Sequence, residues 1–145
     1  MAARSKARRR AFQILFEADQ RGSSVQEVLA DQVRLARSDE HQPPVNEFTM
    51  QLVEGYSSHI DRIDDLIATY AVDWDLDRMP AADRNIVRLG AYELIWEDGT
   101  PDAVAIDEAV QLAKEFSTDE SPAFVNGLLG RFKDLKPRLR RDADA

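Results

Sequence analysis

The segment AADRNIVRLGAYELIWE, residues 81–97, is the most apolar helix-like stretch of the chain, and it organises the predicted fold. Read as a helix, it carries apolar side chains on nearly every side, which is typical of a helix at the centre of a bundle. Gly90 interrupts the segment at a cost of about 1 kcal/mol in helix propensity. We therefore expect another helix to cross closely at Gly90, and we expect Tyr92 to lie in the core.

Two further helices are predicted downstream of this segment, and each has its own start signal. Thr100 followed by Pro101 is expected to cap and begin the first of them, and Ser121 followed by Pro122 the second. Apolar residues then recur at helical spacing in both. The charged tail, residues 137–145, is expected to be frayed.

Four helices are predicted upstream, ahead of a linker at residues 72–80. Ser24 and Glu27 have the spacing of a capping box, which begins the second of these helices. Two prolines, Pro43 and Pro44, separate it from the third. The linker's Trp74 is expected to pack onto the core. By helical periodicity the four helices cover about residues 4–19, 25–36, 45–56 and 59–71.

No segment has the two-residue alternation of a strand, so the sequence predicts an all-α protein of about seven helices. A chain of 145 residues has the length of one domain and can bury a core unaided. We expect a single helical domain over residues 1–136. No stretch approaches the length and hydropathy of a membrane span, and no export segment follows the basic start, so we expect no membrane association.

Paired carboxylates in the fourth helix raise the alternative of a metal or acid–base site. Asp61, Asp64 and Asp65 share one side of that helix. However, the chain has only two histidines, no cysteine and none of the common phosphate-binding or nucleophile motifs. A solvated acidic face explains the aspartates better. We expect no catalytic residue, metal or cofactor, and the absence of cysteine suits a reducing cytoplasm.

Charge is segregated along the chain, whose formal net charge is −8. Residues 1–10 hold five bases and no acid, and residues 131–141 hold six bases and one acid, whereas residues 22–130 hold seven bases and 22 acids. An acidic body repels nucleic acid, so binding would be confined to a basic site.

The basic start RSKARRRAFQILFEAD, residues 4–19, predicts such a site on an amphipathic helix. Its apolar stripe would dock the helix, with Phe12 and Phe16 at the edge. An arginine beside a partly exposed aromatic ring can hold a phosphate while the ring stacks a base. The predicted RNA-binding residues of this helix are Arg4, Lys6, Arg8, Arg9, Arg10, Gln13 and Phe16. The simpler alternative is a solvated basic terminus with no specific ligand.

Several sequence motifs resemble those of the NusB family of transcription antitermination factors. They are LDRMPAADRNIVR at residues 76–88 with AYEL at 91–94, VAIDEAVQLAK at 104–114, SPAFVNGLL at 121–129, and the start RRRA at 8–11 with Leu15 and Phe16. The resemblance covers residues 4–135. A related domain precedes the catalytic part of RNA cytosine-5 methyltransferases, but because this chain ends near residue 145 we expect no such domain here.

This resemblance implies two small helical bundles that share the central helix. It also implies that the chain binds single-stranded RNA, namely the boxA segment of nascent ribosomal RNA, together with the ribosomal protein NusE. That assembly would join the elongating RNA polymerase and suppress termination. A homodimer that hides the basic helix is left open.

Three further site predictions rest on the resemblance. The arginine-rich first helix would be the RNA-binding element, and Lys114 and Glu120 are added to its residues. Glu120, in an acidic step that is a family feature, would accept hydrogen bonds from exposed base donors. Phe16 stands where many relatives have tyrosine, which keeps the stacking face but removes a hydroxyl.

A second hypothesis stays beside RNA binding. In it, the chain is a protein-interaction adaptor whose acidic body docks a basic ribosomal protein, and RNA binding is secondary.

Overall fold

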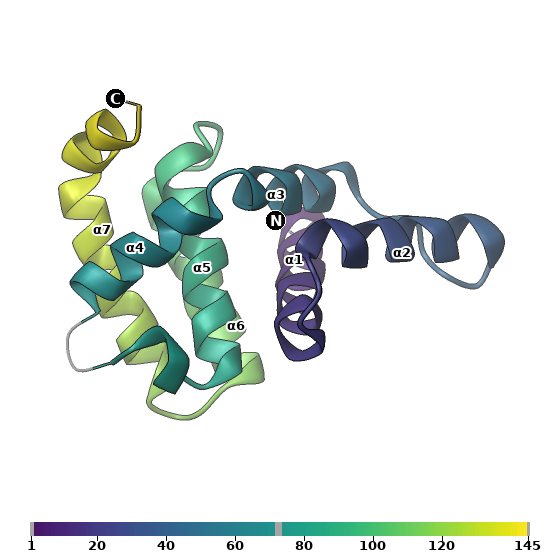
Figure 1. Cartoon of the computed structure of the whole chain (residues 1–145), viewed down its shortest axis with the longest axis horizontal. Coiled ribbons are helices and arrows are strands. Elements are labelled where there is room, and N and C mark those ends of the chain that lie inside the picture. Colours follow the sequence, from purple (N-terminus) through teal and green to yellow (C-terminus); the bar gives the residue numbers. More distant parts are fainter. Residues whose placement is uncertain (1, 72–73, 145) are drawn as a thin grey trace. The chain divides into compact units, whose positions relative to one another are not determined.

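The computed structural model describes residues 2–71 and 74–144. Within these residues the chain is all-α, with seven α-helices, one short 3-10 helix and no strand (Figure 1). The chain divides into two compact units between Ser58 and His59. The elements are α1 (Ala2–Arg21), α2 (Val25–Ser38), α3 (Glu47–Ser57), α4 (Ile60–Tyr70), η1 (Leu76–Arg78), α5 (Ala81–Trp96), α6 (Asp102–Phe116) and α7 (Ser121–Asp144).

The first unit is a three-helix bundle in which α1 packs against α2 and α3, and α2 packs against α3. The predicted apolar stripe of α1 forms its core, with Ala7, Ala11, Ile14, Leu15 and Ala18 all buried. A buried polar contact also joins α1 to α3, because the Thr49 hydroxyl donates to the carbonyl oxygen of Ala7 at 2.9 Å. The amphipathic docking of α1 is therefore confirmed.

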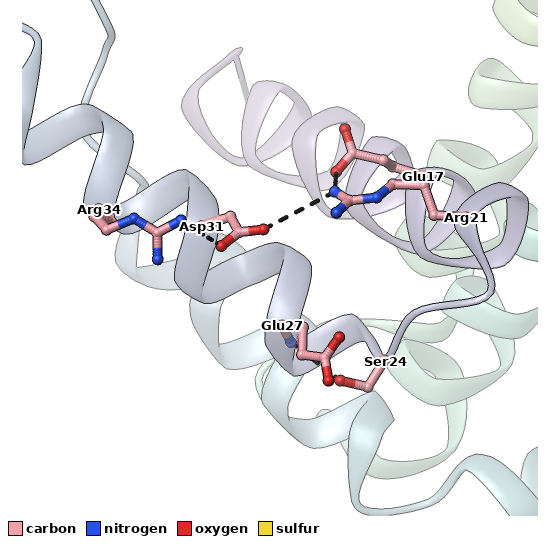
Figure 2. Close-up of polar contacts among 6 residues, drawn as sticks. All are labelled: Glu17, Arg21, Ser24, Glu27, Asp31 and Arg34. Atoms are coloured by element: carbon pink, nitrogen blue, oxygen red, sulfur yellow. Dashed lines mark hydrogen bonds and ion pairs between the residues drawn. The ribbon is translucent and has the colours of Figure 1, made fainter.

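The predicted start of α2 is confirmed by its hydrogen bonds. The backbone N–H of Glu27 donates to Ser24 Oγ at 3.1 Å, which caps the helix. Gly22 precedes this cap at φ +67°, a left-handed conformation that glycine adopts without strain. Figure 2 shows the cap beside a chain of ion pairs that links the two helices, since Arg21 lies 3.1 Å from Glu17 and 3.9 Å from Asp31.

The second unit is organised by α5, which packs against α4, α6 and α7. Most of its side chains are buried, as its composition predicts. Gly90 is the point of closest approach, because a Cβ atom added there would lie 2.8 Å from Leu129 Cδ1 on α7 and 3.2 Å from Ala109 Cβ on α6. The expectation of a close helix crossing at Gly90 is confirmed, and two helices rather than one make the approach.

Both predicted cap-then-proline starts are wrong in detail. Pro101 itself occupies the N-cap position of α6, and Thr100 donates its hydroxyl hydrogen bond to the buried carboxylate of Glu93 at 2.9 Å. Ser121 is already the first residue of α7, and its hydroxyl bonds to Ser117 and Thr118. Thr100 thus bonds to a side chain of α5 instead of capping α6, and Ser121 bonds to the turn that precedes α7.

The linker and the tail differ from expectation as well. Trp74 is 45% exposed instead of packed on the core, whereas Met79 is buried. Val72 and Asp73 lie outside the described residues. Helix α7 continues through Pro137 to Asp144, and the side chain of Leu139 is buried beyond the proline. Among the described residues, no helix combines the length and apolarity needed to cross a bilayer.

Tyr92 lies in the core, as predicted, and its hydroxyl donates to Glu97 Oε2 at 3.2 Å. Burial raises the pKa of Tyr92 far above its ordinary value near 10, and the negative charges of Glu97 and Glu93 raise it further. The folded chain therefore keeps a proton that the unfolded chain releases at alkaline pH.

This shift predicts how stability depends on pH. The raised pKa stabilises the folded state fully below about pH 10, and that stabilisation is lost as the pH rises above this value. Urea unfolding midpoints should be measured at pH values below and above about 10. As the pH rises, the midpoint should fall more steeply for the wild type than for Tyr92→Phe, which keeps the ring but has no proton to release. Parallel slopes for the two proteins would contradict the prediction.

Candidate nucleic-acid interface

Helix α1 presents an exposed stripe made of Lys6, Arg9, Gln13 and Phe16. The spacings of three, four and three residues place these side chains along one side of the helix. Lys6, Arg9 and Gln13 are exposed, and Phe16 is half-buried. We call this set the α1 stripe. It offers two cations, one amide and one aromatic ring in a row, and proteins that bind single-stranded nucleic acid combine cations with aromatic rings.

Phe16 is supported from below by a second aromatic ring. Its centroid lies 5.9 Å from that of Phe12, and the two ring planes are tilted by 47°. Phe12 is buried in the core of the first unit. The contact restricts the position of the Phe16 ring while part of its surface stays open to solvent.

Arg4 and Arg8 are directed to another part of the unit. Both guanidinium groups lie over the ring of Phe48 in α3, with Cζ-to-centroid distances of 4.4 and 5.2 Å. Arg8 is only 3% exposed. These are cation–π contacts, which stabilise the packing of α1 on α3.

Arg10 holds the loop between α2 and α3. Its Nε donates to Gln32 Oε1 at 3.1 Å, and its Nη1 donates to the carbonyl oxygens of Pro43 and Pro44 at 3.2 Å each. The five bases of the N-terminal segment therefore have different surroundings. Lys6 and Arg9 have exposed side chains on the α1 stripe, and Arg4, Arg8 and Arg10 contact residues of α2, α3 and the loop between them.

This division predicts different outcomes for two alanine substitutions. Arg8→Ala should lower the free energy of unfolding by about 1–2 kcal/mol, because it removes a desolvated cation–π contact and the packing of a buried aliphatic stem. Lys6→Ala, one turn or less away on the exposed side, should leave stability nearly unchanged. Urea unfolding at neutral pH measures both. Equal unfolding midpoints for the two variants would contradict the division.

Lys114 and Glu120 belong to the second unit, and both are exposed. Lys114 lies in the last turn of α6, and Glu120 directly precedes α7.

A hollow of about 220 Å³ adjoins Glu120, and sequence reasoning missed it. The rings of Trp74 and Phe124 lie there with their centroids 6.4 Å apart. Helical periodicity predicts an inward Phe124, and the one available signal for the hollow is an apolar tryptophan within an aspartate-rich linker. The hollow is lined by Trp74, Met79, Pro80, Asp83, Thr118, Glu120, Ser121 and Phe124.

Hydrogen bonds hold the floor of this hollow. The buried carboxylate of Asp83 accepts from the Ser117 hydroxyl, and Ser121 donates to Ser117 at 3.0 Å. This network fixes the turn before α7. Exposed Thr118 and Glu120 are therefore presented from a rigid support beside two aromatic rings.

The carboxylates of α4 lie in different surroundings. Asp64 accepts two hydrogen bonds from Arg88 of α5, at 2.9 and 3.0 Å, while Asp61 and Asp65 are exposed. In the described part of the chain, no group of three His, Asp or Glu side chains is arranged to hold a metal ion. The aspartates are a solvated face plus one structural ion pair.

Comparison with known proteins gives a consistent result along the whole chain. The chain is 80% identical over 142 residues to the transcription antitermination protein NusB of Streptomyces griseus subsp. griseus, which covers 98% of this chain and 99% of that protein. It is 72% identical over 142 residues to the protein of the same name from Streptomyces coelicolor, which covers 98% of this chain and 100% of that protein.

Solved NusB structures are also similar to this chain. T. maritima NusB superposes with a TM-score of 0.80 at 32% identity and covers 96% of each chain. A NusB chain from a crystal structure of antitermination factors NusB and NusE in complex with dsRNA has a TM-score of 0.77 at 28% identity, covering 92% of this chain and 98% of that chain. Residues 5–134 match the NusB family, and the chain belongs to that family.

Proposed function

We propose that this chain is a transcription antitermination factor that binds the boxA segment of nascent ribosomal RNA together with the ribosomal protein NusE. In this role it joins the RNA polymerase elongation complex in the cytoplasm and acts without catalysis. The α1 stripe is the observation that carries the proposal, because cations and a supported aromatic ring lie in one row on an acidic protein. The related NusB structure in complex with NusE and dsRNA supports the choice of NusE as partner and of RNA as the class of ligand.

In the proposed mechanism, Lys6 and Arg9 neutralise RNA phosphates, and Gln13 donates to or accepts from a base edge. Phe16 stacks an unpaired base, which contributes about 1–3 kcal/mol. Because Phe16 has no hydroxyl, its side chain contacts RNA by stacking alone and makes no hydrogen bond to it.

The second unit contributes a further contact in this proposal. Glu120 accepts from base N–H donors, and Trp74 and Phe124 offer aromatic surface in the same hollow. An ionised carboxylate accepts hydrogen bonds and has none to donate. It therefore favours a base edge with two neighbouring donors and repels phosphates. Lys114 supplies a phosphate contact from α6.

A titration of labelled boxA-like RNA against a scrambled RNA, with and without NusE, tests the function. We expect tighter binding of the boxA-like RNA and a further gain when NusE is present. Equal affinity for both RNAs in the presence of NusE would refute sequence-specific recognition.

In the adaptor hypothesis, the contact with the ribosomal protein NusE dominates and RNA binding is secondary. The structural support for this hypothesis is α6, where Asp107 and Glu115 are exposed and the apolar side chain of Val104 is exposed as well. Such a surface suits a basic protein. A pull-down of NusE from nuclease-treated extract separates the two hypotheses, because persistence of the pair without RNA favours the adaptor role and its loss means that RNA bridges the proteins.

A further inference from the structure

A groove between α2 and α3 in the first unit has no part in the proposed RNA site. Its volume is about 590 Å³, and all the residues that line it come from these two helices. None comes from α1, so the groove and the α1 stripe have no residue in common. The question is what the groove can hold.

The floor of the groove is apolar. Leu29 and Val33 of α2 and Met50 of α3 line it, together with Ala30, which is exposed. The lining residues of α2 run from Gln26 to Ser38, which corresponds to about three turns of helix. An apolar strip of this length, open along its side, matches the face of an amphipathic helix.

The rim of the groove is charged, and its two edges have opposite signs. Arg34 and Arg37 line the α2 side, and Glu54 lies on the α3 side. Arg34 Nη2 lies 2.6 Å from Oδ1 of Asp31 (Figure 2), a residue that does not line the groove. Arg37 and Glu54 are both exposed. Arg34 and Arg37 thus form a positive edge in a part of the chain, residues 22–130, that holds seven bases and 22 acids.

We propose that this groove docks an amphipathic helix of a partner protein, about three turns long, whose acidic edge pairs with Arg34 and Arg37. The groove walls are side chains of two helices, so no unpaired backbone edge is available for an added strand. Apolar residues three and four apart in the partner would contact Leu29, Val33 and Met50. The charges set the direction and the specificity of docking.

Two labelled helical peptides of about 14 residues can test this proposal by fluorescence anisotropy. Both carry leucines at spacings of three and four, and one edge carries glutamates in the first peptide and lysines in the second. The wild type is expected to bind the glutamate peptide at least about tenfold more tightly than the lysine peptide.

Variants on α2 provide matched controls. Ala30→Glu places a charge on the floor and should weaken binding at least about tenfold, whereas Leu35→Glu should not, because Leu35 is 53% exposed on the same helix but does not line the groove. Arg37→Glu should reverse the preference between the two peptides. Circular dichroism confirms that each variant is folded, and unchanged RNA affinity of Ala30→Glu separates this site from the proposed function.

Three outcomes would overturn the proposal. The first is equal binding of both peptides, and the second is an equal effect of Ala30→Glu and Leu35→Glu. In the third, sedimentation shows that the wild type self-associates and that Ala30→Glu abolishes this, which would assign the groove to a second copy of the chain.

Discussion

Replacing Lys6, Arg9 and Phe16 together by alanine is expected to abolish most of the RNA affinity while leaving the fold intact. Removing one phosphate contact should flatten the dependence of log K on log salt concentration by about 0.7 for a single strand, so the two cations account for about 1.4. Without stacking on Phe16, binding should weaken by a further 1–3 kcal/mol, roughly 5- to 150-fold. Fluorescence titrations of labelled RNA at several salt concentrations measure both effects.

Single variants separate the two contributions. Phe16→Ala should lower the affinity at every salt concentration with the slope unchanged, whereas Arg9→Ala should change the slope. Arg37→Ala is the matched control for charge, because it removes one exposed arginine from the same unit but from α2. If Arg37→Ala and Arg9→Ala weaken binding equally, the effect is one of net charge, and the α1 stripe is not the binding site.

The local parts of this fold follow from the sequence because they depend on residues close together in the chain. The buried side of α1 and the cap of α2 at Ser24 are set by helical period and by a side chain three residues from its partner. Thr100 shows the limit of this reasoning. Its hydroxyl could cap α6, but the buried carboxylate of Glu93 needs a donor, and that need outweighs the cap.

The proposed RNA-binding surface follows from the sequence only in part. The basic, amphipathic character of α1 identifies the helix, but the roles of its five bases depend on residues far along the chain. Arg8 is committed to Phe48, and Arg10 to the Pro43 and Pro44 carbonyls, contacts that periodicity cannot reveal. Likewise, the pairing of Trp74 with Phe124 joins two segments that share no local pattern.

Gly90→Val is expected to cause the largest loss of stability, about 2–3 kcal/mol. Any Cβ at this position would lie 2.8 Å from Leu129 Cδ1 and 3.2 Å from Ala109 Cβ. The Leu129 side chain is fully buried and cannot move into solvent, and the Cβ of Ala109 is fixed to the backbone of α6. Valine adds two further methyl groups to this crossing, so α6 and α7 must both shift away from α5.

Gly127→Ala is the matched control, because a Cβ added at this helical glycine of α7 meets no atom within 4 Å. Alanine should raise stability there by up to about 1 kcal/mol through helix propensity alone. Gly90→Ala gains the same propensity but must also fit its methyl group between Leu129 and Ala109. Thermal and urea unfolding of the three variants therefore separates propensity from packing. If Gly90→Ala stabilised the chain as much as Gly127→Ala does, the close packing of α6 and α7 against Gly90 would not limit the side chain at this position.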